Sequence, residues 1–241
     1  FRPTAQRVKE IIDKIPYITI AFSNLSEIGS EMTQSESARK ILRVRRHFRQ
    51  ADPLLFPVLA NMKLEPLRPL ENTGQYFAKL CREIISQQLG NGAAHAIVDR
   101  FFALFPGCGP TPTRVAALPE KDLRRVGMSW AKARYLGDLA AKTAAGELDF
   151  KKLPGADDET VIDELTKVKG IGRWTAEMFL IFTLGREDIF SYGDLGLRKG
   201  FARLYGKRRA SSPAGMERVV RQWTPYRSYA SLALWHISDG E

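Results

Sequence analysis

The sequence contains few residues that bind metals or form disulfides. Its 241 residues include two cysteines, Cys81 and Cys108, and three scattered histidines, His47, His95 and His236. The separation of the cysteines gives neither a disulfide framework nor a metal-ligand pair. An iron–sulfur cluster needs four cysteines, or two cysteines with two histidines. Because the histidines are scattered along the chain, we exclude such a cluster, and we expect no cofactor and no metal bound by side chains. Two thiols suit a reducing compartment.

Long apolar runs are also absent. No stretch approaches the roughly 18 consecutive apolar residues that a membrane-spanning helix requires. The beginning of the chain, "FRPTAQRVKEIIDKI", lacks the apolar core of a signal peptide. We therefore expect an intracellular protein with no membrane partner, in the cytoplasm or nucleoid of a prokaryote or in the nucleus of a eukaryote. At about 150 residues per domain, the length predicts one large domain or two small ones.

Positive charge is in excess. The chain has 37 Lys and Arg against 27 Asp and Glu, a net charge of +10. Such a surface attracts polyanions, so nucleic acid is the leading partner and acidic lipid is the rival. The segment "ARKILRVRRHFRQ" is either a solvated helix face or a phosphate-binding stripe. Its basic residues are Arg39, Lys40, Arg43, Arg45, Arg46 and Arg49.

Helical spacing of apolar residues dominates from about residue 75 onward, with Gly and Pro between the segments. Two helices are predicted in "GQYFAKLCREIISQQL" and "AAHAIVDRFFALF", and three short ones follow with boundaries near Pro119 and Gly127. The residues expected on the inner faces of the first two are Phe77, Leu80, Ile84, Ile85, Ile97, Phe101 and Leu104. Almost no period-two alternation occurs, which predicts an all-α bundle.

The first 50 residues predict a short, mostly helical extension with a little β-structure. A helix is expected near "TAQRVKEIID" and a short strand at "YITIAF". A polar loop and the basic helix described above follow. We expect residues 51–241 to form the core of the protein.

A helix, a glycine hairpin and a second helix are predicted in "DETVIDELTKVKGIGRWTAEMFLIFTL", residues 158–184. The second helix is apolar nearly all round, so it should be buried. A dinucleotide-binding fingerprint would need a preceding strand and a glycine at Thr175, and a P-loop would need a Gly-Lys-Ser/Thr ending. The hairpin is therefore either an ordinary interhelical turn or a turn whose N–H groups, beside Lys169 and Arg173, hold a phosphate.

The segment "IFSYGDLGLRKGF", residues 189–201, carries one carboxylate, Asp194, in apolar surroundings. An aspartate directly before a helix can cap it, because its side chain accepts backbone N–H groups of the first turn. Asp194 is equally a candidate for the one acid that performs chemistry. The segment alone does not separate the two interpretations.

Five ordered segments resemble one known family. "LTKVKGIGRWTAEMFL" and "DIFSYGDLGLRKG" resemble the helix-hairpin-helix and Gly/Pro-Asp core of the base-excision DNA glycosylases (HhH-GPD). "REIISQQLGNGAA", "LRRVGMSWAKARYL" and "WTPYRSYASLALW" resemble further parts of its alkylated-base subfamily, the 3-methyladenine DNA glycosylase II type. The resemblance covers residues 50 to 240. It implies a two-lobed helical bundle, with the hairpin unit at 161–184 and a catalytic loop at 188–198.

The resemblance implies roles for individual residues. Asp194 is implied as the catalytic acid. Trp174 stands where bifunctional relatives place a nucleophilic lysine, so a Schiff base with the sugar is not available. Leu89 is implied as a wedge that enters the duplex beside Gln87 and Gln88, and the alternative is that Leu89 packs in the core. The residues implied to grip the DNA backbone are Val168, Lys169, Gly170, Ile171, Gly172, Arg173 and Thr175.

A base pocket is implied as well. Its residues are Trp235, Trp174, Met178 and Tyr192, and plain core packing is the alternative for the tryptophans. Tyr192 stands where the family usually has proline, and Met178 stands where some relatives have an aromatic residue. A main-chain alkali-ion site at Thr166, Val168 and Ile171 is also compatible with the resemblance.

The implied enzyme is a monomeric, monofunctional DNA glycosylase of base excision repair. It flips an alkylated base, of the 3-methyladenine or 7-methylguanine type, out of double-stranded DNA and hydrolyses its N-glycosidic bond with the help of Asp194. Two alternatives stay open. One is a glycosylase for a deaminated or oxidised base, and the other is a non-enzymatic DNA-binding protein in which Asp194 is only a cap.

Overall fold

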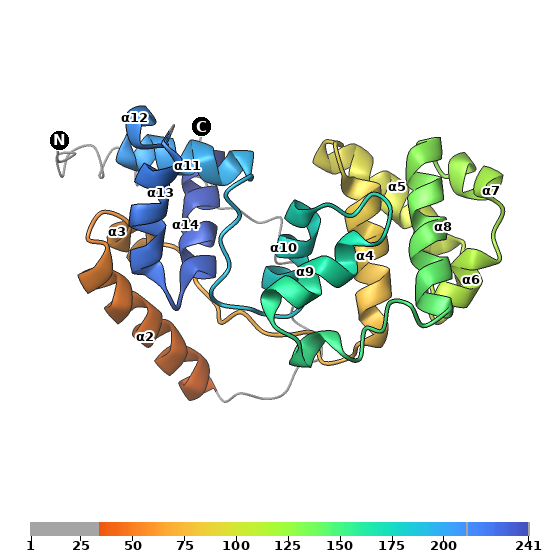
Figure 1. The fold of residues 1–241 in the computed structure, drawn as a ribbon, viewed down its shortest axis with the longest axis horizontal. Helices are drawn as coiled ribbons and strands as arrows, with labels where there is room; N and C mark the ends of the chain where they lie inside the picture. Colours follow the sequence, from red (N-terminus) through yellow and green to blue (C-terminus); the bar gives the residue numbers. More distant parts are fainter. Residues whose placement is uncertain (1–33, 211, 241) are drawn as a thin grey trace. The chain divides into compact units, whose positions relative to one another are not determined.

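Helices are the regular secondary structure of the part that the computed structural model describes, residues 34–210 and 212–240 (Figure 1). These residues contain no strand, so the predicted all-α class is confirmed. The predicted helix at 4–13 and strand at 17–22 lie outside the described residues. The α-helices are α2 (Gln34–Ala51), α3 (Phe56–Asn61), α4 (Gly74–Ser86), α5 (Asn91–Ala103), α6 (Pro112–Ala116), α7 (Glu120–Arg125), α8 (Trp130–Ala144), α9 (Asp158–Thr166), α10 (Arg173–Phe182), α11 (Leu195–Tyr205), α12 (Lys207–Ala210), α13 (Pro213–Val220) and α14 (Arg227–Asp239), and the 3₁₀ helices are η1 (Leu153–Gly155) and η2 (Arg221–Trp223).

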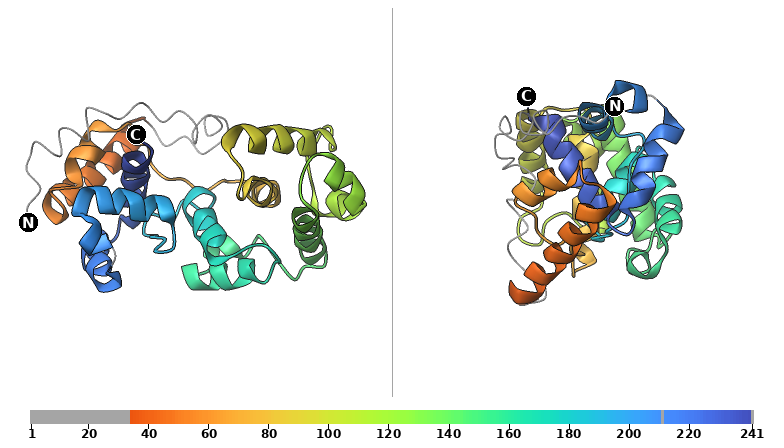
Figure 2. Two further views of the ribbon diagram at one scale, coloured as in Figure 1. Left: turned by 90° about the horizontal axis from the view of Figure 1, so that it is seen from above. Right: turned by 90° about the vertical axis from the view of Figure 1, so that its left-hand side faces the viewer.

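Two compact units make up the described part of the chain. The first unit combines the segment that ends at Arg68 with the segment from Gly185 onward. Helices from the two ends of the described chain therefore pack together, as the colours of Figures 1 and 2 show. The second unit is the continuous segment Pro69–Leu184, which holds α4 to α10. The predicted boundary at residue 50 stays a prediction.

In the first unit, α11 and α14 approach each other closely. A Cβ added at Gly200 of α11 would lie 2.1 Å from the carbonyl oxygen of Leu234 in α14, a distance that no real Cβ tolerates. Only glycine permits this contact. Phe201, Trp223 and Tyr229 are fully buried in the same unit.

A buried carboxylate joins the separate segments of the first unit. Asp52, between α2 and α3, accepts the N–H groups of Leu54 and Leu55 with Oδ1, both at 3.1 Å. Its Oδ2 accepts the hydroxyl of Tyr205 at 2.6 Å and Nε1–H of Trp223 at 2.8 Å. Four donors therefore satisfy Asp52, which holds the N-terminal helices against α11 and η2.

In the second unit, α4 buries the four residues predicted for its inner face, together with Tyr76 and Cys81. The Tyr76 ring meets Phe179 of α10 edge-to-face, with 5.4 Å between ring centroids. The prediction that the second hairpin helix is buried is confirmed for Thr175 to Ile181. The inward placement of Leu104 is wrong, because α5 ends at Ala103 and leaves Leu104 38% exposed as its C-cap.

Within residues 34–210 and 212–240, none of the helices has the length and apolar character needed to cross a membrane.

Candidate functional site

The carboxylate of Asp194 lies at the N-terminus of α11. Its backbone is extended, with φ −72° and ψ 123°, and Oδ1 accepts the N–H of Leu197 at 2.7 Å. The residue is only 7% exposed. The cap interpretation is therefore confirmed, and the cap holds the acid in one orientation. Its catalytic role stays a prediction.

A second donor reaches the same oxygen from α14. Nε1–H of Trp235 donates to Oδ1 of Asp194 at 3.0 Å. This contact depends on Gly196, because a Cβ there would lie 3.0 Å from Cδ1 of Trp235 and 3.2 Å from Oδ1 of Asp194. Two helices of the first unit thus fix one oxygen of a buried acid. The structure links Trp235 directly to Asp194, which the prediction of a base-pocket role did not include.

The loop before Asp194 is anchored to the start of α14. Oγ of Ser228 donates to the carbonyl oxygen of Arg186 at 2.7 Å and accepts the N–H of Ile189 at 3.0 Å. Arg227 pairs with Asp188 through Nε and a terminal nitrogen, at 2.8 and 3.1 Å. These contacts restrain the loop although it lacks the family's usual proline.

Tyr192 presents an aromatic ring from this loop. It is 43% exposed, and its ring meets Phe190 edge-to-face with 4.9 Å between centroids. Burial of part of the ring raises the pKa of Tyr192 above its ordinary value, so the phenol is neutral at physiological pH. The first unit therefore brings Asp194, Trp235 and Tyr192 onto connected elements.

The glycine hairpin of the second unit is shaped by α8. Gly170 has φ +83°, and a Cβ there would lie 2.1 Å from Cδ2 of Tyr135, so the tyrosine ring packs directly on the turn. The N–H of Lys169 donates to Oδ2 of Asp138 at 2.9 Å. The N–H of Ile171 closes the turn on the carbonyl oxygen of Val168 at 3.1 Å. The hairpin is therefore held both by its own backbone hydrogen bond and by side chains of α8.

Arg173 opens α10, but its charge is matched inside the fold. The guanidinium donates to both carboxylate oxygens of Glu159, at 2.9 and 2.6 Å, and to Glu177 at 3.0 Å. These hydrogen bonds and charges raise the pKa of Arg173 further. The N-cap of α10 is Gly172, which has no side chain to accept N–H groups of the first turn. Backbone donors at this helix end therefore suit an anion better than the arginine side chain does.

The segment after α4 is tied to the hairpin. Nε2 of Gln87 donates to the carbonyl oxygen of Gly170 at 2.9 Å and to Oγ1 of Thr175 at 3.4 Å. The side-chain amide of Gln87 is thus hydrogen-bonded within the fold, whereas Gln88 is exposed. Gln88 is the one described non-glycine residue with positive φ, at 58°, and such strain often occurs at functional sites. Leu89 beside it is partly exposed, so full burial in the core does not account for it.

Lys132 of α8 binds the C-terminal end of α4, directly before Gln88 and Leu89. Its Nζ donates to the carbonyl oxygens of Ile85 and Gln87, at 2.8 and 2.6 Å, at the C-terminus of α4. Burial lowers the pKa of Lys132. A cation at a helix C-terminus is favourable and satisfies its last carbonyl groups. Lys132 therefore fixes where α4 ends and where Gln88 and Leu89 begin.

The two other predicted pocket residues belong to the second unit. Trp174 is 44% exposed at the start of α10, while Met178 is buried one turn later. Their places in a base pocket stay predictions. The alkali-ion site at Thr166, Val168 and Ile171 also stays a prediction. Among the described residues, no three His, Cys, Asp or Glu side chains gather as metal ligands.

Sequence reasoning did not identify Lys132, Tyr135 and Asp138 as supports of the site. All three lie on α8, and the Lys169–Asp138 contact, for example, joins residues 31 positions apart. No local spacing carries such information. The matching segment "LRRVGMSWAKARYL" was the only signal that this region belongs with the hairpin.

Known proteins are similar to this chain in sequence and fold. A family model described as HhH-GPD superfamily base excision DNA repair protein matches residues 81–226. A Bacillus subtilis protein with the provisional name DNA-3-methyladenine glycosylase YfjP is 36% identical over 158 residues, which are 63% of this chain and 55% of that protein. The chain thus spans about half the length of that relative.

Two solved structures have the same fold. The DNA-3-methyladenine glycosidase of Bacillus halodurans is 36% identical, with a TM-score of 0.69 over 81% of this chain and 88% of that one. The Schizosaccharomyces pombe 3-methyladenine DNA glycosylase, solved in complex with abasic DNA, is 29% identical, with a TM-score of 0.67 over 80% of this chain and 95% of that one.

Proposed function

Because the chain belongs to the HhH-GPD superfamily of base excision DNA repair proteins, we propose that it is a monofunctional DNA glycosylase that removes alkylated bases of the 3-methyladenine and 7-methylguanine type from double-stranded DNA. The observation that carries the proposal is the buried carboxylate of Asp194, held by Leu197 and Trp235. The names of the similar proteins support the substrate class. A monomeric state and an intracellular location belong to the same proposal.

The chemistry needs one acid. Cleavage of an N-glycosidic bond builds positive charge on the deoxyribose, and the carboxylate of Asp194 stabilises that charge while water attacks the sugar. The bond between sugar and base breaks, and its electron pair leaves with the base. Alkylation at a ring nitrogen already makes the base a cationic leaving group, so no strong general acid is required.

Fixed geometry makes Asp194 effective. Donors that are already in place do not have to reorganise during the reaction, and burial strengthens electrostatic interactions. The N–H of Leu197 and the indole N–H of Trp235 hold Oδ1 in this way. The carboxylate is therefore oriented before substrate binds.

Aromatic rings provide discrimination. The rings of Trp235 and Tyr192 are electron-rich, and cation–π attraction favours a charged alkylated base by about 0.5 to 2 kcal/mol. The neutral phenol of Tyr192 suits this role. Trp174 and Met178 are the further pocket residues of the proposal.

The second unit grips the DNA in the proposal. Backbone N–H groups at Gly172 and the start of α10 hold a phosphate, and the exposed side chain of Lys169, whose Nζ lies 4.0 Å from Oδ1 of Asp138, adds positive charge. Leu89 enters the duplex where the base has left, with Gln88 beside it. Gln87 fixes the distance between these two contacts, because its amide bonds to the hairpin.

The strand stays intact in this reaction. At the start of α10 the chain has Trp174, which provides no amine. Without that amine no Schiff base forms with the sugar, and the abasic strand is not cleaved.

The deciding experiment is base release from duplexes that each carry one lesion. Free 3-methyladenine or 7-methylguanine, with an intact abasic strand, supports the proposal. Release only from uracil or oxoguanine duplexes points to a different lesion. Binding of DNA without release of any base contradicts the enzymatic assignment.

A further inference from the structure

Helix α2 has an inner and an outer face. At about 100° per residue, Ile41, Val44 and Phe48 share one side, and all three are buried in the first unit. Arg39, Arg43 and Arg46 share the opposite side and are exposed. The apolar face therefore attaches α2 to the first unit, and the arginine face is directed away from it.

The basic residues of α2 divide into two groups. Lys40 pairs with Glu187 at 2.5 Å, and Arg45 donates to the carbonyl oxygens of Leu59 and Met62 at 3.1 and 3.2 Å. These two cations stabilise the first unit. Arg39, Arg43 and Arg46, here called the arginine stripe, make no such contact with a carboxylate or carbonyl group in the described part of the chain.

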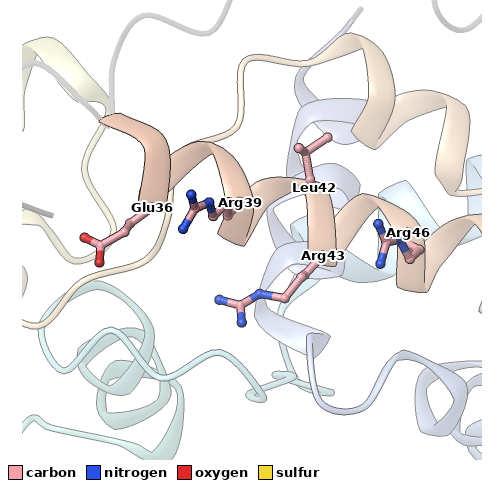
Figure 3. Close-up of a pocket in the computed structure, with 5 residues that line it drawn as sticks. All are labelled: Glu36, Arg39, Leu42, Arg43 and Arg46. Carbon is pink, nitrogen blue, oxygen red and sulfur yellow. The ribbon is translucent and has the colours of Figure 1, made fainter. Parts of the chain in front are cut away.

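The arginine stripe is regular and strongly charged. Its members lie at positions i, i+4 and i+7, so they span about 10 Å along the helix. Like charges one turn apart destabilise a helix by a few tenths of a kcal/mol. Figure 3 shows the three arginines along α2 with Leu42 and Glu36, and these five residues line an open hollow. Such a row of guanidinium groups matches a row of phosphates, which removes the repulsion and forms bidentate hydrogen bonds.

We infer that the arginine stripe binds the phosphate backbone of DNA, as a contact separate from the glycine hairpin. The inference rests on the proposed function in taking DNA as the partner. A lipid surface fits less well, because a membrane-binding helix exposes a broad apolar face. The apolar face of α2 is buried, and among the described residues that line the hollow Leu42, 59% exposed, is the one large apolar side chain. The contact adds affinity without sequence preference.

The test measures how DNA binding depends on salt. The variant Arg39→Gln, Arg43→Gln, Arg46→Gln is compared with wild type on an undamaged duplex, between roughly 50 and 200 mM salt. Each lost phosphate contact lowers the log–log slope by about 0.9, so the slope should decrease by about 2.7. The matched control is Lys121→Gln, Arg125→Gln, Lys151→Gln, which removes three exposed charges from the second unit. The control should keep the wild-type slope.

A charge-retaining variant, Arg39→Lys, Arg43→Lys, Arg46→Lys, should restore most of the slope. An unchanged slope in the glutamine variant overturns the inference. An equal decrease of the slope in the control variant also overturns the inference, because the effect then comes from the net charge of the protein. If the glutamine variant loses binding to anionic lipid vesicles and keeps the wild-type slope for DNA, lipid is the partner and the inference is overturned. Failure of the wild-type protein to release alkylated bases contradicts the proposed function alone, since binding is measured on undamaged DNA.

Discussion

At the scale of single residues, Asp194 shows that capping a helix and performing catalysis are compatible. The cap bond to Leu197 uses Oδ1, and Trp235 donates to the same atom. An unsupported aspartate would sample several rotamers, and only some of them would face a sugar. The two donors select one orientation, so the acid need not be ordered when DNA binds.

The variant Asp194→Asn keeps the shape of the side chain and its capping oxygen but removes the negative charge. We expect single-turnover base release to fall by at least about a hundredfold, the usual cost of a lost transition-state electrostatic contact. Affinity for DNA should stay within a few-fold of wild type. A rate near that of wild type would show that Asp194 is only a cap.

The variant Trp235→Phe keeps an aromatic ring and removes the indole N–H. A hydrogen bond to a charged group contributes about 1.5 to 3 kcal/mol, so release should slow by roughly tenfold to a hundredfold. Affinity for undamaged DNA should not change. Trp130→Phe, at the exposed start of α8, is the matched control and should keep the wild-type rate. Equal rates of base release for both variants would show that Trp235 does not position Asp194.

At the scale of elements, the hairpin depends on neighbours distant in sequence. Tyr135 and Asp138 of α8 support its turn, and Gln87 joins it to the end of α4. Two elements of the second unit, α8 and the end of α4, thus set the position of one loop. A loop held in this way loses little conformational entropy when it meets a phosphate.

The two hairpin glycines allow a matched test. At Gly170, where φ is +83° and the Tyr135 ring lies 2.1 Å from an added Cβ, alanine should destabilise the fold by about 1 to 3 kcal/mol. At Gly172 an added Cβ meets nothing within 4 Å, so alanine should leave the unfolding temperature nearly unchanged. In DNA titrations, Gly172→Ala should still weaken binding, because the methyl group hinders a phosphate. Equal losses of stability for the two variants would contradict the interpretation that the fold requires glycine at position 170 and not at position 172.

Much of this arrangement was predictable from local sequence. Helical spacing predicted α4, α5, α6, α7, α8, α9 and α10, and Asp194 before "LGLRKGF" predicted a cap. The exposure of Leu104 was not predictable, because periodicity does not show where a helix ends. The charge matching of Arg173 by Glu159 and the hydrogen bond of Lys132 to the end of α4 depend on tertiary contacts. Such contacts join residues whose spacing has no helical period.

At the scale of the whole molecule, the chain divides the proposed reaction between its units. The first unit, built from both ends of the described chain, carries Asp194, Trp235 and the arginine stripe. The second unit, a continuous segment, carries the hairpin and Leu89. The proposed catalytic acid and the glycine hairpin therefore belong to different compact units, whereas proposed phosphate contacts come from both.

Stability of the molecule should decrease on the acid side of neutrality. Burial lowers the pKa of His236, against a smaller opposing effect of Asp239. The unfolded chain therefore binds a proton more readily, and folding loses stability as the pH falls through about 6.5 and below. Thermal unfolding between pH 7.5 and 5.5, read at about half-unit steps, should show a steeper decline for wild type than for His236→Gln. Parallel curves would exclude His236 as the source.

The close contact at Gly200 has a consequence for the interpretation of natural variants. Any side chain there would push against the carbonyl of Leu234, the residue next to Trp235. A genetic screen for sensitivity to alkylating agents would then score a Gly200 substitution as a catalytic defect, although the residue has no part in the proposed contacts with base or sugar. Sorting variants by their distance from the substrate would overlook it, and sorting them by the α11–α14 contact would identify it.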